Sequence, residues 1–181
     1  MRALFLDRDG VINVDHGYVH AAANFDFTPG IFDLTRRAQD AGFRLVVVTN
    51  QAGIARGYYT EAQFRELTDW MVARFRERGV DIALVQWSPF HPTAGRPPYD
   101  RDSFWRKPNP GMILDAARRL RLDPGRSLML GDQPTDMTAA LRAGVPRRVL
   151  VTHGTGIDSA DATDRVADIE EAARRFGELV G

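Results

Sequence analysis

Apolar runs of strand length alternate along this chain with segments whose apolar residues recur at helical spacing. Five runs are predicted to be strands: 3–7, 44–49, 82–87, 127–130 and 148–152. Five segments are predicted to be helices: 31–41, 60–78, 111–122, 134–143 and 169–179. This alternation with short connections predicts an α/β fold, a doubly wound, Rossmann-like parallel sheet covered by helices on both faces.

Local signals support the helix ends. Gly42, Gly79 and Gly144 directly follow three of the predicted helices, where glycine commonly ends a helix. Thr60 and Gln63 have the spacing of a capping box at the start of the second one. Two long segments, 8–29 and the proline-rich 88–110, are predicted to be irregular. No linker, repeat or low-complexity stretch interrupts the pattern, so residues 1–181 are expected to form one domain without an inserted cap.

Composition excludes several classes of protein. The 24 basic and 24 acidic residues cancel, which gives no electrostatic footprint for nucleic acid or an anionic membrane surface. Cysteine is absent, which excludes disulfides, thiolate metal sites and a cysteine nucleophile. The longest apolar runs are too short to span a bilayer, and an acidic residue follows the first apolar run too soon for a signal peptide. We expect a cytoplasmic protein, and a monomer, because no exposed apolar stripe stands out in the sequence.

Polar residues follow the predicted strands at the points where each strand ends. The first strand is followed by Asp7 and Asp9, the second ends at Thr49, and the fourth is followed by Asp132. Lys107, the only lysine among the 24 basic residues, precedes the third helix. In doubly wound sheets the carboxyl ends of the strands meet at one edge, where ligands bind. Carboxylates beside an ammonium and a hydroxyl indicate a site for Mg²⁺ and phosphate together.

Each of these residues also has an ordinary structural interpretation. Asp7 and Asp9 fit a turn or a calcium loop, although Tyr18 stands where the twelfth-position glutamate of such a loop would be. Thr49 could cap a turn, Lys107 could be a solvated surface residue, and Asp132 could cap a helix. Four such coincidences in one order, each at the end of a strand or the start of a helix, favour the functional interpretation.

In this order the residues resemble the motifs of the haloacid dehalogenase (HAD) superfamily of phosphohydrolases. Within it, the chain is most similar to the group of histidinol-phosphate and D-glycero-D-manno-heptose 1,7-bisphosphate phosphatases. The resemblance extends from residue 3 to about residue 152 and rests on five stretches: 5–10, 13–19, 48–57, 106–112 and 129–137. The Asp-His-Gly-Tyr stretch at 15–18 points to the heptose branch of the group.

The resemblance implies a role for each matching position. Asp7 would be the nucleophile that forms an aspartyl-phosphate, and Asp9 the general acid and base. Thr49 and Lys107 would stabilise the transferring phosphoryl group. The metal Mg²⁺ would be held by the side chains of Asp7 and Asp132 and the carbonyl of Asp9, with Asp136 behind these ligands. The implied substrate-binding residues are Arg8, Asp15, His16, Gly17, Tyr18, Asn50, Gln51, Ala52, Arg106 and Gln133.

The sequence departs from the family pattern in one loop. Many relatives carry a structural zinc site there, with a Cys-x-His pair followed by a Cys-x-Cys directly before Arg-Lys-Pro. The corresponding positions here are 88–90 and 103–105, which contain no cysteine; one remaining imidazole, His91, cannot form a tetrahedral site. We therefore predict that structural zinc is absent, and that Phe90, Tyr99, Trp105 and the prolines hold the loop by packing.

The expected activity is that of a Mg²⁺-dependent phosphatase that removes the 7-phosphate of D-glycero-D-manno-heptose 1,7-bisphosphate. Hydrolysis of histidinol phosphate in histidine biosynthesis is the first alternative, and a non-catalytic sugar-phosphate-binding protein is the second. A signalling receiver domain is disfavoured, because its phosphorylated aspartate would follow the third strand, where this chain has Trp87 and Ser88. The intact Asp9 argues against a binding protein, since binding alone needs no general acid. The preferred anomer of the sugar stays open.

Overall fold

The computed structural model describes all 181 residues around a six-stranded sheet in which neighbouring strands run parallel. In chain order the strands are Arg2–Leu6 (β1), Phe43–Asn50 (β2), Ile82–Ser88 (β3), Leu128–Gly131 (β4), Arg147–Val151 (β5) and Asp164–Val166 (β6). Their order in the sheet is β3-β2-β1-β4-β5-β6, so the chain starts in the middle and winds outward in both directions. The predicted doubly wound α/β fold is confirmed.

Seven α-helices accompany the sheet. They are Ile31–Asp40 (α1), Ala52–Arg56 (α2), Glu61–Glu77 (α3), Gly111–Leu120 (α4), Pro134–Arg142 (α5), Ile169–Arg174 (α6) and Phe176–Val180 (α7). Two 3-10 turns, Ala22–Asn24 and Pro124–Arg126, complete the elements. Because all five strands and four of the five helices predicted from the pattern lie within about two residues of these bounds, periodicity was a sufficient guide for them.

Three details differ from the prediction. The sequence pattern did not indicate α2 or β6, because five and three residues are too few to show a period. The expected helix 169–179 is two helices, because the backbone at Arg175 leaves helical geometry with φ −91° and ψ 5°. The capping box is confirmed: the Thr60 hydroxyl accepts from the backbone N–H of Gln63, whose side chain accepts in return from that of Thr60.

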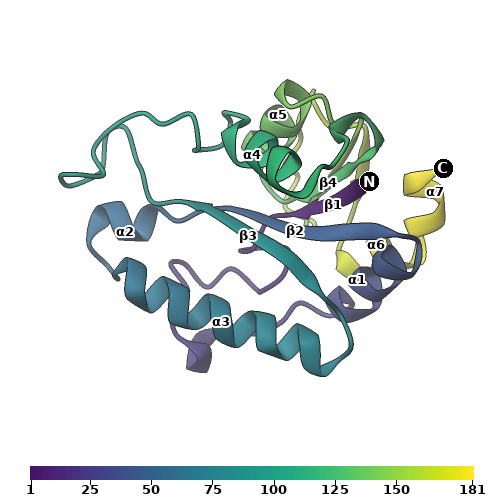
Figure 1. The fold of residues 1–181 in the computed structure, drawn as a ribbon, viewed down its shortest axis with the longest axis horizontal. Coiled ribbons are helices and arrows are strands. Elements are labelled where there is room, and N and C mark those ends of the chain that lie inside the picture. The colour runs from purple at the N-terminus through teal and green to yellow at the C-terminus, as the bar shows by residue number, and fades with distance from the viewer.

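The two faces of the sheet pack against different helices, as Figure 1 shows, with α4 and α5 on one side and α1 and α3 on the other. Side chains alternate along β1, so Leu4 and Leu6 join the core beneath α1, α3 and α6. Ala3 and Phe5 join the core beneath α4 and α5. Burial on both faces explains why the strands are continuous apolar runs rather than alternating ones.

The carboxyl ends of β1, β2 and β4 lie side by side, because these strands are neighbours in the sheet. Leu6 pairs with Val47 on one side and with Leu130 on the other, so the residues that follow each strand emerge at one edge. The irregular segment after β3 extends beyond α2 as a long loop before α4 begins (Figure 1). No helix combines the length and apolar character that crossing a membrane requires.

Candidate active site

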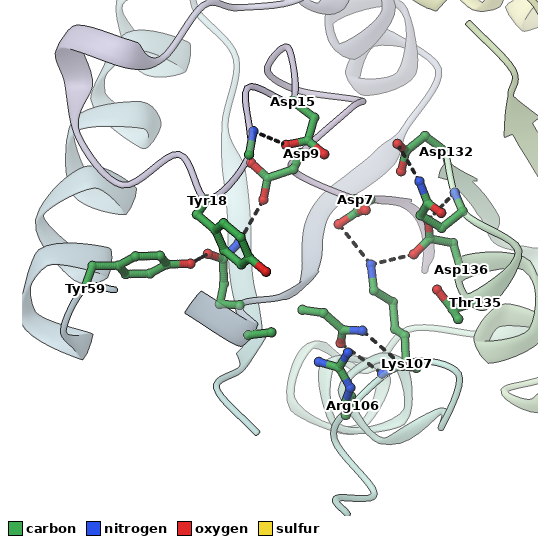
Figure 2. A pocket seen from close by; sticks show the side chains of 15 residues that line it. Asp7, Asp9, Asp15, Tyr18, Tyr59, Arg106, Lys107, Asp132, Thr135 and Asp136 are labelled. Carbon is green, nitrogen blue, oxygen red and sulfur yellow. Dashed lines mark hydrogen bonds and ion pairs between the residues drawn. The ribbon is translucent and has the colours of Figure 1, made fainter. Parts of the chain in front are cut away.

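A cavity of about 400 Å³ lies at the carboxyl edge of the sheet (Figure 2). Strand ends, the loop after β1 and the first turns of α2 and α5 all contribute to its wall. Its lining residues are Asp7, Asp9, Asp15, Gly17, Tyr18, Asn50, Gln51, Ala52, Tyr59, Arg106, Lys107, Asp132, Gln133, Thr135 and Asp136. The loops that approach the cavity lie far apart in the sequence, so the fold assembles the site.

Lys107 is the central cation of the cavity (Figure 2). Its Nζ lies 2.9 Å from Asp7 Oδ1 and 2.5 Å from Asp136 Oδ1, and it donates to the carbonyl of Val48 at 2.8 Å. Two hydrogen bonds of 3.0 Å between the Asn50 side chain and the Lys107 backbone fasten this residue to the end of β2. The position of the ammonium is therefore set by three oxygen atoms and by the backbone that carries it.

Burial and crowding change the acid–base properties of these groups. Burial raises the pKa of Asp7 well above its usual value; nearby Asp136 raises it further, although Lys107 opposes the rise. Burial and Asp136 also raise the pKa of Asp132, to about 6. Burial alone would lower the pKa of Lys107, but Asp136 and Asp7 outweigh it and raise that pKa. Lys107 is thus charged at neutral pH, beside Asp7 and Asp132, whose pKa values are raised.

Asp7, Asp132 and Asp136 offer carboxylate oxygens that lie within 4.8 Å of one another. Of these three residues only Asp7 and Asp136 are paired with a cation, and Asp132 Oδ1 is buried without any hydrogen-bond partner. Excess negative charge and an unpartnered buried carboxylate oxygen fit a small divalent cation with oxygen ligands. The donor set is thus suited to Mg²⁺ in its chemistry, and it includes two of the three predicted ligands, Asp7 and Asp132.

Two glycines allow this close approach of backbone and carboxylate. A Cβ at Gly10 would lie 2.2 Å from Asp132 Oδ2, and the residue has a φ of +81°, which side-chain-bearing residues rarely adopt. A Cβ at Gly131 would lie 2.4 Å from atoms of Asp136. The glycines that follow Asp9 and precede Asp132 in the sequence therefore serve the cluster, since any larger residue would displace a carboxylate.

Asp9 lies on a different wall of the cavity from Lys107 (Figure 2). Its carboxylate accepts hydrogen bonds from Asn13 at 3.0 Å, from Gln51 at 3.1 Å and from Arg8 at 2.8 Å. The Gln51 amide also donates to the Thr49 hydroxyl at 2.9 Å and accepts from the Tyr59 hydroxyl at 2.5 Å. The orientation of the Gln51 amide is thereby defined, and one side chain links Asp9 to Thr49.

Most of the predicted site residues lie on the cavity wall, but three do not. Arg8 is 2% exposed and points into the protein behind Asp9. Thr49 is buried beneath Gln51, and His16 points outward to form an ion pair with Asp26. The structure therefore does not bring Arg8, Thr49 or His16 to the wall, where direct contacts with the substrate or its phosphoryl group would be made.

Two lining residues, Tyr59 and Thr135, had no counterpart among the sequence predictions. Thr135 stands next to Asp136 in the first turn of α5, a position that the neighbouring motif could have indicated. Tyr59 precedes the cap of α3, and its ring stacks on that of His20 at 5.0 Å between centroids. Only the fold brings it beside Gln51.

Comparison with known proteins places the chain among phosphatases. Residues 104–177 match the family model described as HAD-hydrolase-like. The D-glycero-beta-D-manno-heptose-1,7-bisphosphate 7-phosphatase of Escherichia coli is 46% identical over 179 residues, which cover 96% of this chain and 94% of that enzyme. The enzyme of the same name from Haemophilus influenzae is 42% identical and covers 97% of this chain and 98% of its own length.

A solved structure extends the likeness to three dimensions. The D,D-heptose 1,7-bisphosphate phosphatase from B. bronchiseptica, crystallised with magnesium and phosphate, superposes with a TM-score of 0.82. It is 28% identical in sequence, and the match covers 98% of this chain and 99% of the other. With relatives this similar along nearly its whole length, the chain belongs to the HAD-like family of D-glycero-D-manno-heptose 1,7-bisphosphate 7-phosphatases.

Proposed function

We propose that this protein is a Mg²⁺-dependent phosphatase that removes the 7-phosphate of D-glycero-D-manno-heptose 1,7-bisphosphate through an aspartyl-phosphate. The observation that carries the proposal is the pairing of buried Asp7 with Lys107 at 2.9 Å, in a cavity whose wall also holds Asp9. A nucleophile, a fixed cation and a second carboxylate in one cavity are the parts needed for phosphoryl transfer to a side chain. The names of the relatives support the substrate.

Asp7 and Asp132 are the side chains that would hold Mg²⁺, with the carbonyl of Asp9 as a third protein ligand. Asp136 lies close enough to contribute through its own carboxylate or through Lys107. When bound, Mg²⁺ would neutralise charge on the phosphoryl oxygens and on the crowded carboxylates. The unpartnered oxygen of Asp132 and the complex of the B. bronchiseptica relative with magnesium support this assignment.

In the first step, an Asp7 oxygen attacks phosphorus and the bond from phosphorus to the sugar oxygen breaks. Asp9 donates a proton to that oxygen, so the sugar leaves as an alcohol. Lys107 donates to the phosphoryl oxygens as charge shifts. Thr49, which lies off the cavity wall, acts behind Gln51 by accepting a hydrogen bond from its amide. Asn50 already fixes the backbone of Lys107, so its ammonium needs only to exchange one of its three present acceptors for a phosphoryl oxygen.

In the second step, Asp9, now ionised, takes a proton from water, which attacks phosphorus and breaks the bond to Asp7. Phosphate leaves, and both carboxyl groups return to their starting states. One residue can serve as acid and then as base because the proton it gives to the sugar is replaced by the proton it takes from water.

The remainder of the substrate would lie against Asp15, Gly17 and Tyr18 on one side and Arg106 on the other. Arg106 is half-buried; burial and the nearby Arg56 lower its pKa, although Asp102 opposes the change. Two arginines at this side of the cavity, Arg56 and Arg106, would attract the second phosphate of a bisphosphate. Ala52 and Gln133 complete the wall. We propose that the substrate is a small molecule, with no nucleic-acid or membrane partner, and that the protein is a monomer.

We also propose that the loop between β3 and α4 is held without zinc. His91 Nδ1 accepts hydrogen bonds from the backbone N–H groups of Ala94 at 3.0 Å and Thr93 at 3.3 Å. Burial and nearby arginines lower the pKa of His91, which favours the neutral ring that can accept these bonds. Tyr99 packs against Phe90, with ring centroids 6.0 Å apart, and donates to Glu61 at 2.8 Å.

The packing differs from the prediction at one residue. Trp105, expected to help hold the loop, is 40% exposed and contacts Phe104, which is 57% exposed. Arg106 contributes instead by donating from Nη1 to the carbonyl of Phe90 at 3.0 Å. The loop is thus closed on itself by the Arg106–Phe90 hydrogen bond and the Phe90–Tyr99 contact, and the Tyr99–Glu61 hydrogen bond ties it to α3.

Purified protein is expected to contain less than about 0.1 zinc per chain, since a tetrahedral structural site needs four ligands and only His91 is present. Inductively coupled plasma mass spectrometry after dialysis measures this ratio. Stoichiometric zinc that survives dialysis would overturn the proposal. Zinc lost on dialysis with no change in melting temperature would be adventitious and would support it.

Phosphate release from a panel of substrates tests the proposed function. The panel contains both anomers of D-glycero-D-manno-heptose 1,7-bisphosphate, histidinol phosphate and fructose 1,6-bisphosphate, each with Mg²⁺. We expect kcat/KM for the heptose bisphosphates to exceed that for histidinol phosphate by about 100-fold or more, because the Arg106 side recognises a second phosphate that histidinol phosphate lacks. Preference for histidinol phosphate would keep the chemistry and change the substrate. No turnover of any compound would favour a binding protein.

A further inference from the structure

The guanidinium of Arg8 is enclosed by the protein directly behind the cavity. The side chain is 2% exposed, and by volume Arg8 is the largest of the fully buried residues. Aromatic rings lie near it, Phe25 with its centroid 6.0 Å from Arg8 Cζ and Phe64 at 5.8 Å. A buried guanidinium in aromatic surroundings needs a carboxylate partner, because an unpaired charge there would be costly.

Asp9 is that partner. Arg8 Nη2 lies 2.8 Å from Asp9 Oδ1 and 2.9 Å from Oδ2, so one nitrogen bridges both oxygens of the carboxylate. The same nitrogen donates to the carbonyl of Val19 at 2.7 Å, in the loop that carries Tyr18. Nε and Nη1 are buried without hydrogen-bond partners, so only Asp9 and Val19 fix the guanidinium through hydrogen bonds.

The contacts of Asp9 arrive from inside the protein. Arg8 and Asn13 approach its carboxylate from the loop after β1, and Gln51 approaches from the end of β2. Asp9 nonetheless reaches the cavity wall, with 22% of its side chain exposed. Arg8 therefore holds the carboxylate from behind while its open side faces the space where substrate would lie.

We propose that Arg8 is a positioning residue for Asp9: it aims the carboxyl group at the leaving oxygen and does not bind substrate itself. The inference rests on the proposed function, in which Asp9 gives a proton to the departing sugar oxygen and later takes one from water. A buried arginine whose one hydrogen-bonding nitrogen spans both Asp9 oxygens limits rotation of the carboxyl about its own axis. The carboxyl is thus presented in one orientation, which proton transfer requires.

The role makes a specific prediction about leaving groups. An alkyl phosphate, such as a sugar phosphate, needs a proton on its leaving oxygen, whereas p-nitrophenyl phosphate releases a stable phenolate without one. Misplacing Asp9 therefore slows attack by Asp7 on the alkyl ester but not on the aryl ester. A residue that only supported the fold would slow both reactions by one factor.

Arg8→Lys is the variant to test, because it keeps the buried positive charge and loses the arginine geometry. In rapid-quench experiments with Mg²⁺, we expect its first turnover of the sugar bisphosphate to be at least about 30-fold slower than in wild type. The first-turnover burst of p-nitrophenolate should stay within about threefold of wild type, with a slower steady state. The ratio of the two rates cancels any difference in the folded fraction.

Controls separate the outcomes. Arg37→Lys alters an exposed arginine paired with Asp33 and should leave both rates unchanged. In the Asp9→Asn background, Arg8→Lys should cause no further loss on the sugar substrate, since Arg8 acts through Asp9. If Arg8→Lys does not fold, Arg8→Gln, which removes the buried charge and keeps an N–H donor, is expected to show the same ratio.

Equal slowing of the two first turnovers, or an additive loss in the Asp9→Asn background, would overturn the proposal. Unchanged rates on both substrates would overturn it as well. If instead the proposed function is wrong, the wild-type protein itself will not hydrolyse the sugar bisphosphate, and this result distinguishes the two failures. In that case the comparison is made with whichever alkyl phosphate the wild-type protein does hydrolyse.

Discussion

Asp7→Asn is expected to lower kcat on the heptose bisphosphate by at least about four orders of magnitude, because an amide cannot attack phosphorus to form the acyl-phosphate. Asp7 is the carboxylate closest to the Lys107 ammonium after Asp136, and it follows directly from the end of β1. Steady-state phosphate release with Mg²⁺ measures the loss. Activity within tenfold of wild type would exclude Asp7 as the nucleophile.

The same variant should fold at least as well as wild type in the absence of metal. Burial and Asp136 raise the pKa of Asp7, so its ionised form destabilises the folded state at neutral pH. A group whose folded pKa is raised contributes stability below its unfolded pKa and loses it as pH rises. The neutral amide therefore removes a cost at pH 7, and we expect an equal or higher Tm by calorimetry. The exposed Asp33→Asn is the matched control.

Lys107→Met is expected to remove activity and destabilise the protein together. Loss of the ammonium leaves Asp7, Asp132 and Asp136 crowded without a cation, and breaking such a buried pair costs about 3–5 kcal/mol. For a chain of this length that corresponds to a fall in Tm of roughly 6–20 °C. The rate should fall by about 10²-fold or more, since Lys107 no longer donates to the phosphoryl oxygens.

Lys107→Arg tests whether the positive charge alone is sufficient at this position or whether the compact shape of the ammonium is also needed. The Lys107 Nζ fits between Asp7, Asp136 and the Val48 carbonyl as a compact point charge, and a planar guanidinium cannot take that place without displacing one of them. We expect the arginine variant to recover part of the lost Tm and little of the lost rate. Wild-type kcat in this variant would contradict the assignment. Recovery of neither property would indicate that the guanidinium does not enter the site.

The compact shape of the Lys107 ammonium gives a physical reason why this position has the only lysine of the chain. Arginine is used at 23 of 24 basic positions, and the one lysine occupies the single place where three oxygens surround a compact ammonium. In the sequence Lys107 could have been a solvated surface residue, but its place in the order of motifs favoured a functional role. The contacts of Lys107 supply a physical reason for its retention.

Periodicity was enough to predict the sheet and its main helices, because both faces of the sheet are buried and the strands are continuous apolar runs. The order of polar residues at strand ends also indicated which side chains would meet, since parallel strands place their carboxyl ends at one edge. Asp7, Asp9, Lys107 and Asp132 were all recognisable in this way, and all four line the cavity.

The direction in which side chains point could not be predicted. Arg8 stands between two cavity residues in the sequence, and the motif suggested contact with substrate, yet it turns inward between Phe25 and Phe64. Those rings come from segments 17 and 56 residues away, so no local pattern could reveal them. The same holds for Tyr59, whose hydroxyl meets Gln51 only because α2 and α3 fold back over the end of β2.

The sequence by itself therefore determined the parallel α/β sheet, the edge at which the polar residues gather and most of the side chains that line the cavity there. The hydrophobic period and the positions of the strand ends are local properties of a chain, so they can be predicted without information on distant contacts. Only the tertiary structure decided that three carboxylates crowd around one ammonium, that Asp132 keeps an unpartnered oxygen and that Arg8 supports Asp9 from behind. Distances between remote segments, and the burial that shifts their pKa values, arise from packing alone.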